Sequence, residues 1–251
     1  MGILYNRYTP EKIVTYTVTI TINNNITRTG GALVQTDLSG PMTAVTLSPK
    51  DTYRINPPSG SSGITVTASG NNYVISGTPT ADVTLSFTTT QNPDILTSTQ
   101  KNIANWEVSR GGTYGFIIDR NNPTQWHVDA ASTLGLNNEG YYCNISSLSS
   151  DATYQFSLTY KVAPRGSYSN EGCVIGVTRS NVNHNIYQHR LGFITISGTQ
   201  TEYITETVNF TNTSYSGDWA RYLAITNVSY SLTTRDGAGT IYIQDMTLRQ
   251  I

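Results

Sequence analysis

Apolar and polar side chains alternate strictly along two stretches of this chain. In residues 14–22, valine, tyrosine and isoleucine stand at every second position, and threonines lie between them. In residues 154–162, aromatic and aliphatic side chains alternate with Gln155, Ser157, Thr159 and Lys161. A period of two places one side of an extended chain against a core and the other side in water. Each stretch therefore predicts a β-strand with one buried face.

Shorter segments of the same kind fill the rest of the chain, and turn-forming residues separate them. In the first third they are 32–35, 43–47, 52–55, 64–68, 73–76 and 83–88, and later they are 173–178, 192–197, 203–210, 222–226 and 240–248. No segment has a convincing helical period. Many short strands at this spacing predict an all-β protein built from sandwiches.

A turn motif indicates the kind of sandwich in the N-terminal part. Residues 73–80 have the sequence Tyr-Val-Ile-Ser-Gly-Thr-Pro-Thr and precede the strand predicted at 83–88. This segment resembles the end of bacterial immunoglobulin-like domains, in which an SGTP turn precedes the last strand. The resemblance implies an immunoglobulin-like β-sandwich over residues 13–92 that acts as a spacer or adhesion module. Residues 91–94, Gln-Asn-Pro-Asp, are then expected to form a linker.

Four segments in the remainder of the chain occur in a characteristic order. They are Asn-Ile-Ala-Asn-Trp-Glu at 102–107, the alternating strand at 153–162, the Thr-rich strand at 202–211 and Gly-Thr-Ile-Tyr-Ile-Gln-Asp-Met-Thr-Leu at 239–248. Together they resemble carbohydrate-binding modules of the jelly-roll type and imply a jelly-roll β-sandwich over residues 97–251. The same fold also serves as a structural module in phage tail, fibre and capsid-decorating proteins, so the fold does not decide the function.

The same resemblance implies a metal site. In the family, an acidic residue of the opening motif and one of the closing strand often hold a structural calcium ion, and the matching positions are Glu107 and Asp245. Calcium takes six to eight oxygen ligands, and Gln244 replaces the first of two acidic residues in the closing motif. Two interpretations of Glu107 and Asp245 therefore remain: ligands of a calcium ion, or ordinary polar residues. No other cofactor is expected.

Sugar recognition uses flat aromatic faces against pyranose rings and polar side chains for the hydroxyl groups. Several aromatic residues lie in polar, loop-like segments together with suitable polar neighbours. The predicted carbohydrate-binding residues are Trp126, Tyr168, Tyr187, Gln188, Arg190 and Trp219, and Asn185 and Asp218 are further polar partners. The alternative for each aromatic residue is a partly buried position at the rim of the sandwich or in a subunit contact.

Composition and charge narrow the function classes. The formal net charge is −1 and 12% of residues are charged, so a basic patch for nucleic acid is not expected. Residues 1–12 hold no apolar run, and neither a secretory signal nor a membrane segment is expected there. The two cysteines, Cys143 and Cys173, form no disulfide framework; they are either bridged to each other or free thiols.

Catalysis is not expected. His127 and Asp129 are two residues apart and would share one face of a strand, but no Gly-x-Ser-x-Gly motif accompanies them. Dinucleotide and phosphate-binding glycine motifs are also missing from the sequence. A β-jelly-roll lyase or hydrolase that uses these two residues is the enzymatic hypothesis.

These observations favour a non-enzymatic structural protein of a bacteriophage virion, in capsid decoration, a head fibre or the tail. In this hypothesis the protein assembles in the host cytoplasm, residues 1–12 form an arm that docks on other virion proteins, and the jelly roll faces outward toward host or mucus polysaccharide. A homo-oligomer would suit such an assembly. The alternative is a carbohydrate-binding module of a secreted polysaccharide-degrading enzyme.

Overall fold

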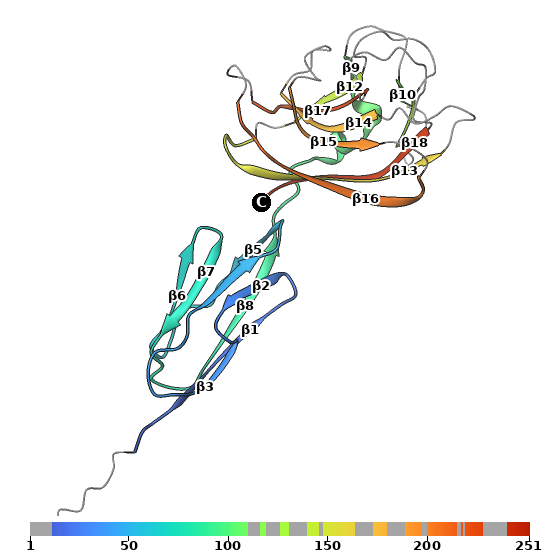
Figure 1. The fold of residues 1–251 in the computed structure, drawn as a ribbon. Helices are drawn as coiled ribbons and strands as arrows, with labels where there is room; N and C mark the ends of the chain where they lie inside the picture. The colour runs from blue at the N-terminus through green and yellow to red at the C-terminus, as the bar shows by residue number, and fades with distance from the viewer. Residues whose placement is uncertain are drawn as a thin grey trace, which may run out of the picture. The chain divides into compact units, whose positions relative to one another are not determined.

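The chain folds into two β-rich units. The computed structural model describes residues 12–109, 116–118, 126–130, 140–145, 148–163, 173–179, 189–196, 200–214, 217, 219–227 and 240–251. Unit 1 is Met1–Gln91 and unit 2 is Asn92–Ile251 (Figure 1). Within the described residues, helix is confined to one α-helical turn, α1 (Ser98–Lys101), and one 3-10 turn (Ile103–Asn105). The predicted all-β fold class is confirmed.

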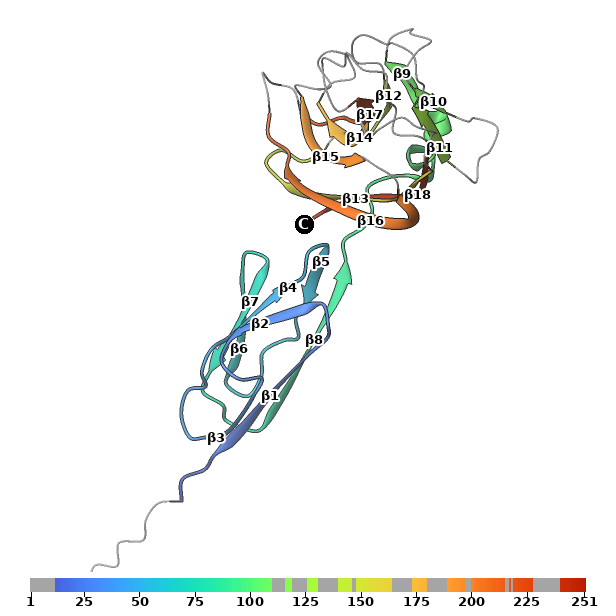
Figure 2. The same ribbon diagram turned by 45° about the vertical axis from the view of Figure 1, so that its right-hand side comes forward.

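Unit 1 is a sandwich of two four-stranded sheets with the orders β3-β1-β8-β5 and β2-β4-β7-β6 (Figure 2). The core lies between them, where Val18, Ile20 and Phe87 of one sheet meet Leu47 and Ile75 of the other. The immunoglobulin-like family of this sandwich stays a prediction. The strands are β1 (Tyr16–Ile22), β2 (Ile26–Gly30), β3 (Val34–Leu38), β4 (Val45–Pro49), β5 (Tyr53–Asn56), β6 (Ile64–Ser69), β7 (Asn72–Gly77) and β8 (Val83–Gln91).

The turn motif of unit 1 has a steric reason for its glycine. Gly77 has a φ of 135°, and a Cβ atom there would lie 2.2 Å from the carbonyl oxygen of Gly63, the residue directly before β6. Any larger residue would push β7 away from β6. The glycine therefore allows these two strands to approach where they pair.

The described strands of unit 2 form two five-stranded sheets. We call β15-β14-β17-β12-β9 the front sheet and β10-β11-β18-β13-β16 the back sheet. From β13 onward the chain crosses repeatedly between them, which is the jelly-roll arrangement predicted for this part. The strands are β9 (Glu107–Ser109), β10 (Phe116–Ile118), β11 (Trp126–Ala130), β12 (Gly140–Asn144), β13 (Thr153–Ala163), β14 (Cys173–Thr178), β15 (Arg190–Ile196), β16 (Gln200–Thr211), β17 (Tyr222–Asn227) and β18 (Thr240–Gln250).

Strand β13 lies between β18 and β16 in the back sheet and shows why the sequence folds this way. Its side chains alternate between buried and half-buried along the whole strand. Tyr154, Phe156, Leu158, Tyr160 and Val162 point into the core with exposures of 3% or less. The strand pairs antiparallel with β16 on one side and β18 on the other. The polar residues between the core positions therefore form the outer face of the back sheet.

Residues 92–96 are held against the last strand of unit 2. The Asp94 carboxylate accepts hydrogen bonds from the backbone N–H groups of Leu96, at 3.1 Å, and Leu248, at 3.0 Å. The Asn92 carbonyl accepts one from the Arg249 guanidinium at 2.5 Å. In the predicted linker 91–94, Gln91 thus ends β8, and Asn92 and Asp94 are bonded to β18.

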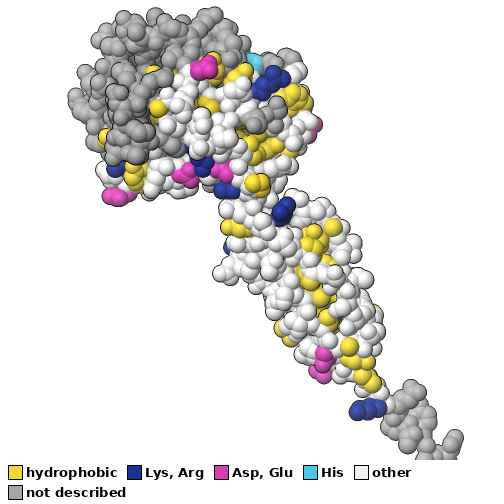
Figure 3. Space-filling model, turned by 180° about the vertical axis from the view of Figure 1, so that it is seen from behind, with side chains coloured by type: hydrophobic (Ala, Val, Ile, Leu, Met, Phe, Trp, Pro, Cys, Tyr) yellow, Lys and Arg dark blue, Asp and Glu magenta, His cyan; other side chains and the backbone are white. Residues whose placement is uncertain are grey.

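The surface that the structure describes carries few charges. On the face drawn in Figure 3, white side chains and backbone predominate over blue and magenta ones. Threonine, serine and asparagine provide these polar positions, in line with the 12% of charged residues. In the described residues, no helix has the length and apolar character required to span a membrane.

Candidate functional site

A register-matched row of side chains crosses the outer face of the front sheet. Strand pairing aligns Glu107 with Tyr142, Tyr142 with Ala224, Ala224 with Gly176, and Gly176 with Phe193. The residues that alternate with them belong to or pack against the core of unit 2: Tyr141, Cys143, Leu223, Ile225, Ile175, Val177 and Ile194. Since successive side chains of a strand point to opposite faces, the row lies on the outside.

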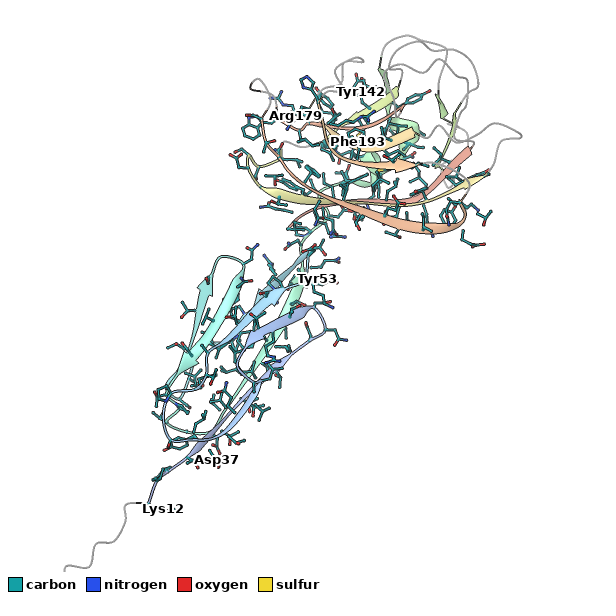
Figure 4. All side chains as sticks on the ribbon, viewed as in Figure 1. Lys12, Asp37, Tyr53, Tyr142, Arg179 and Phe193 are labelled. Atoms are coloured by element: carbon teal, nitrogen blue, oxygen red, sulfur yellow. The ribbon has the colours of Figure 1, made fainter. Side chains whose placement is uncertain are left out.

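Aromatic rings stand at both ends of this row. Tyr142 meets Tyr222 edge to face, with ring centroids 5.7 Å apart and an interplanar angle of 89°. At the other end the Arg190 guanidinium carbon lies 5.1 Å from the centroid of the Phe193 ring. Figure 4 labels Tyr142 and Phe193 on this sheet. We call Glu107, Tyr142, Tyr222, Arg190 and Phe193 the front face.

Small residues separate the two aromatic groups. Ala224 and Gly176 lie between Tyr142 and Phe193 in the row and carry at most a methyl group. A Cβ atom on Gly176 would lie 2.0 Å from the Gly192 carbonyl oxygen, so a larger residue would disturb the pairing of β14 with β15. Ala224 is 0% exposed and Gly176 is buried, so the accessible parts of this row are the half-buried aromatic side chains toward its ends.

Polar groups on the front face are oriented by their neighbours. The Tyr142 hydroxyl donates a hydrogen bond of 2.6 Å to Oε2 of Glu107, whose side chain is exposed. The phenol and the carboxylate thus form one polar group at the Tyr142 end, and the Arg190 guanidinium provides cationic donors at the Phe193 end. Flat rings with a carboxylate and a guanidinium beside them can stack on sugar rings and bond their hydroxyls.

Cys143 lies next to this group on β12. The structure shows it as a free thiol that donates to the Asn144 carbonyl at 3.4 Å. Burial, followed by the negative charge of Glu107, raises the pKa of the Cys143 thiol to about 11. The thiolate, which is the nucleophilic form, is therefore a minor species at neutral pH. Of the two predicted alternatives for this cysteine, the free thiol is the one found.

Buried polar groups bond the described residues at the two ends of the connection between β16 and β17. The Arg179 guanidinium donates to the Thr213 carbonyl at 2.7 Å and to the Thr213 hydroxyl at 2.9 Å. Burial lowers the pKa of Arg179. Asn212, which is fully buried, accepts a hydrogen bond from the Ala220 N–H at 3.1 Å. Ala220, the residue that follows Trp219, is therefore fixed shortly before the start of β17.

The predicted sugar-binding residues divide into three groups. Arg190 lies on the front face, and Trp219 is half-buried just before β17. Trp126 is in β11 of the back sheet, opposite Ile243, and its side chain is outside the described residues. Tyr168, Tyr187 and Gln188 lie outside the described residues as well.

The structure brings Arg190 together with three aromatic residues that the sequence argument missed. Phe193, Tyr142 and Tyr222 stand in hydrophobic strands, so the pattern assigns them to the core. Their outward direction follows from strand alternation once the core partners are known. Alternation needs polar residues to mark the outer face, and the segment Tyr141-Tyr142-Cys143 has none. The sequence therefore gives no signal that Tyr142, and not Tyr141, points outward.

Glu107 and Asp245 do not fit as joint ligands of one calcium ion. Glu107 is bonded by Tyr142 on the front sheet, and Asp245, on the back sheet, is bonded by the Lys101 ammonium at 3.0 Å. Facing sheets lie about 10 Å apart, whereas calcium ligands lie at about 2.4 Å from the ion. Within the part of the chain that is described, no group of three or more His, Cys, Asp or Glu could hold a metal.

Lys101 joins the start of unit 2 to its last strand. Its ammonium lies 2.8 Å from Oδ2 of Asp94 and 3.0 Å from Oδ1 of Asp245. Burial on its own would lower the pKa of Lys101, but the hydrogen bonds and charges of the two aspartates outweigh it and raise the pKa. We call Lys101, Asp94 and Asp245 the clasp.

Lys101→Met is expected to lower the free energy of unfolding of unit 2 by about 1–2 kcal/mol, because two carboxylates lose their shared charged donor. Since the folded pKa is raised, the contribution of the clasp is present below the unfolded value of 10.5 and is lost as pH rises through the folded pKa. Urea unfolding of both proteins between pH 7 and pH 11 measures this. Lys50→Met, at an exposed position of unit 1, is the control. Equal stability of Lys101→Met and wild type at pH 7 would contradict the prediction.

Comparisons with known proteins identify similar folds but no family. No protein-family model and no curated protein matches the chain. Among solved structures, it is similar to the second N-terminal cellulose-binding domain of Cellulomonas fimi β-1,4-glucanase C, with 15% identity, a TM-score of 0.37, and coverage of 63% of this chain and 95% of that one. The CBM22-1 xylan-binding domain from Paenibacillus barcinonensis Xyn10C has 8% identity and a TM-score of 0.38, with coverage of 64% and 96%.

A phage protein is also similar in structure. It is the enzymatically active domain of bacteriophage CBA120 tailspike protein 4, with 13% identity, a TM-score of 0.35 and coverage of 63% of this chain. This chain spans 21% of that chain's length. Similarities of this size do not assign a function, which has to be argued from the front face itself.

Proposed function

We propose that this chain is a non-catalytic glycan-binding protein and that the front face of unit 2 holds the sugar. The observation that carries the proposal is that three half-buried rings, Tyr142, Tyr222 and Phe193, share the outer face of the front sheet with Glu107 and Arg190 beside them. The part of each ring that is not buried can stack on a sugar ring, one toward each end of the row, while Ala224 and Gly176 between them are buried. An extended polysaccharide is therefore the ligand class that suits this face best.

Polar neighbours of the rings add hydrogen bonds to the stacking. The Glu107 carboxylate accepts from sugar hydroxyls, and it already holds the Tyr142 hydroxyl in place at 2.6 Å. The Arg190 guanidinium lies against the Phe193 ring, so it donates from a fixed position at the other end. Such preorganised groups lose little conformational freedom on binding.

The absence of catalysis is part of the proposal. Glycoside hydrolysis needs two carboxyl groups on either side of the scissile bond, about 5–10 Å apart. Among the described residues of the front face, Glu107 is the carboxylate, and the raised pKa of Cys143 makes that thiol a poor nucleophile. The side chains of His127 and Asp129 lie outside the described residues.

The proposed setting is the surface of a bacteriophage virion, assembled in the host cytoplasm. Residues 1–12 then dock on another virion protein, unit 1 is the spacer, and unit 2 presents the front face. Exposed apolar side chains support docking at this end of unit 1, since Ile13 is 75%, Val14 56% and Val34 52% exposed. Burial of these residues in a partner would be favourable. Stoichiometric presence of the chain in purified particles, measured by mass spectrometry, separates this setting from a module of a secreted enzyme.

Phe193→Ala is expected to weaken binding of the full chain to its polysaccharide by about tenfold or more, because the variant loses a buried stacking contact. Affinity electrophoresis against xylan, β-glucan, mannan and host-wall polysaccharides identifies the ligand and compares the variants. Tyr53→Ala, an aromatic substitution in unit 1, is the matched control and should bind like wild type. Thermal melting verifies that Phe193→Ala stays folded.

Two results would overturn the proposed function. One is that no polysaccharide retards the wild-type chain. The other is that a neutral polysaccharide retards wild type and folded Phe193→Ala equally, which would place the neutral sugar elsewhere. Turnover of the bound polysaccharide by the wild-type chain would contradict the non-catalytic part alone.

A further inference from the structure

We propose a second binding site, on the outer face of the back sheet, for the uronic acid residues of an acidic polysaccharide. Its central group is Lys161 on β13, which lies between Tyr203 of β16 and Tyr242 of β18. The ammonium is 4.8 Å from the centroid of the Tyr203 ring and 5.2 Å from that of the Tyr242 ring. We call these three residues the back site.

The two rings fix the position of the lysine charge. A free lysine side chain samples many rotamers, and holding it in place costs about 2 kcal/mol of conformational free energy. Contact with two aromatic faces stabilises one position of the ammonium before any ligand arrives. The back site therefore presents an oriented cation to an incoming anion.

The carboxylates on the neighbouring strands are engaged elsewhere. Asp245 of β18 is bonded by Lys101 at 3.0 Å, and Glu206 of β16 accepts from the Tyr160 hydroxyl at 3.1 Å. Glu202 lies in the irregular part of β16 opposite Lys161 and forms no salt bridge with it. In the described part of the chain, Lys161 takes part in no salt bridge. Its charge is thus available to an external carboxylate.

Tyr203 and the surrounding hydroxyls make a sugar a suitable carrier of that carboxylate. Tyr203 is 42% exposed, so its ring can cover the apolar face of a pyranose. The Thr159 and Thr205 hydroxyls lie beside it, 2.8 Å apart. Further along the same strands, the Gln155 side-chain amide donates to the side-chain oxygen of Asn209 at 3.1 Å. A stacking ring, a fixed cation and neighbouring hydroxyls match the ring, carboxylate and hydroxyls of a uronic acid.

The test compares one polymer with and without its charge. Polygalacturonate and its fully methyl-esterified form are used as probes of the full chain in affinity electrophoresis and biolayer interferometry. Wild type is expected to bind polygalacturonate, more weakly at higher salt, and to bind the methyl ester about tenfold more weakly. Lys161→Gln should lose about the same factor on polygalacturonate, whereas Lys161→Arg should keep most of the affinity.

The front face provides the control. Phe193→Ala should leave polygalacturonate binding unchanged, so failure of the back site and failure of the proposed function are distinguishable. Tyr203→Ala, which removes the stacking ring and keeps the charge, should also weaken binding. The proposal is overturned if wild type does not bind polygalacturonate, if the methyl ester binds equally well, or if folded Lys161→Gln binds like wild type.

Discussion

Trp106→Ala is expected to lower the free energy of unfolding of unit 2 by about 3–5 kcal/mol, the usual cost of removing a large buried aromatic side chain. Trp106 is 1% exposed, and its indole N–H donates to the Gln100 carbonyl at 2.8 Å. It lies directly after the 3-10 turn and packs in the core of unit 2. Alanine would leave a cavity at this position and an acceptor without its donor.

Urea unfolding followed by tryptophan fluorescence measures this loss in unit 2. The three tryptophans of the chain, Trp106, Trp126 and Trp219, all lie in Asn92–Ile251, so the signal does not report on unit 1. Trp106→Phe, which keeps most of the volume and loses the donor, should lose less than half as much as Trp106→Ala. An unfolding midpoint of Trp106→Ala within error of wild type would show that the indole does not support the core.

The β-strands could be predicted because their signal is local. On β13 polar residues follow the buried residues from Tyr154 to Tyr160, and the structure buries every second side chain as the pattern requires. The short helix α1 also has a local signal, which the sequence argument passed over. Thr97 and Gln100 form a capping box, in which the threonine hydroxyl accepts from the Gln100 N–H and the glutamine oxygen accepts from the Thr97 N–H.

The candidate sites could be predicted only in part, because they depend on pairing between distant segments. Lys101 and Asp245 are 144 positions apart, and nothing in either neighbourhood indicates their contact. Likewise, Phe193 and Tyr142 become parts of one face only through the registers of β15, β14, β17 and β12. The sugar-binding residues were predicted from aromatic residues in loop-like segments. The described residues of the front face lie in β-strands, so this criterion missed most of them.

The two binding faces make different demands on the same sandwich. On the front sheet the middle of the row is buried and half-buried rings stand toward both ends, which suits stacking on neutral sugar rings. On the back sheet, Lys161 supplies a charge and Tyr203 one exposed ring. A protein with few charges can use a single oriented lysine as a selective contact, because little else on that face competes for an anion.

Asn212 links three backbone groups inside unit 2, and its replacement is expected to be among the most damaging. It is 0% exposed, and its side-chain nitrogen donates to the carbonyls of Leu148 and Ser149, each at 3.1 Å. Its side-chain oxygen accepts from the Ala220 N–H at 3.1 Å. Asn212→Leu would leave all three groups buried and unbonded, and we expect a loss of about 3 kcal/mol or more.

Asn212→Asp should make this loss dependent on pH. The carboxylate would face two carbonyl oxygens in a buried site, so its folded pKa would lie above the unfolded value of about 3.9. Below the unfolded pKa the aspartic acid is neutral in both states, and the charge penalty is absent. As pH rises from there to the folded pKa, the unfolded chain releases its proton first, and the free energy of unfolding falls. Urea unfolding of both variants from pH 4 to pH 8 should therefore show a decline for Asn212→Asp relative to Asn212→Leu; parallel profiles would mean that water reaches this asparagine in the folded protein.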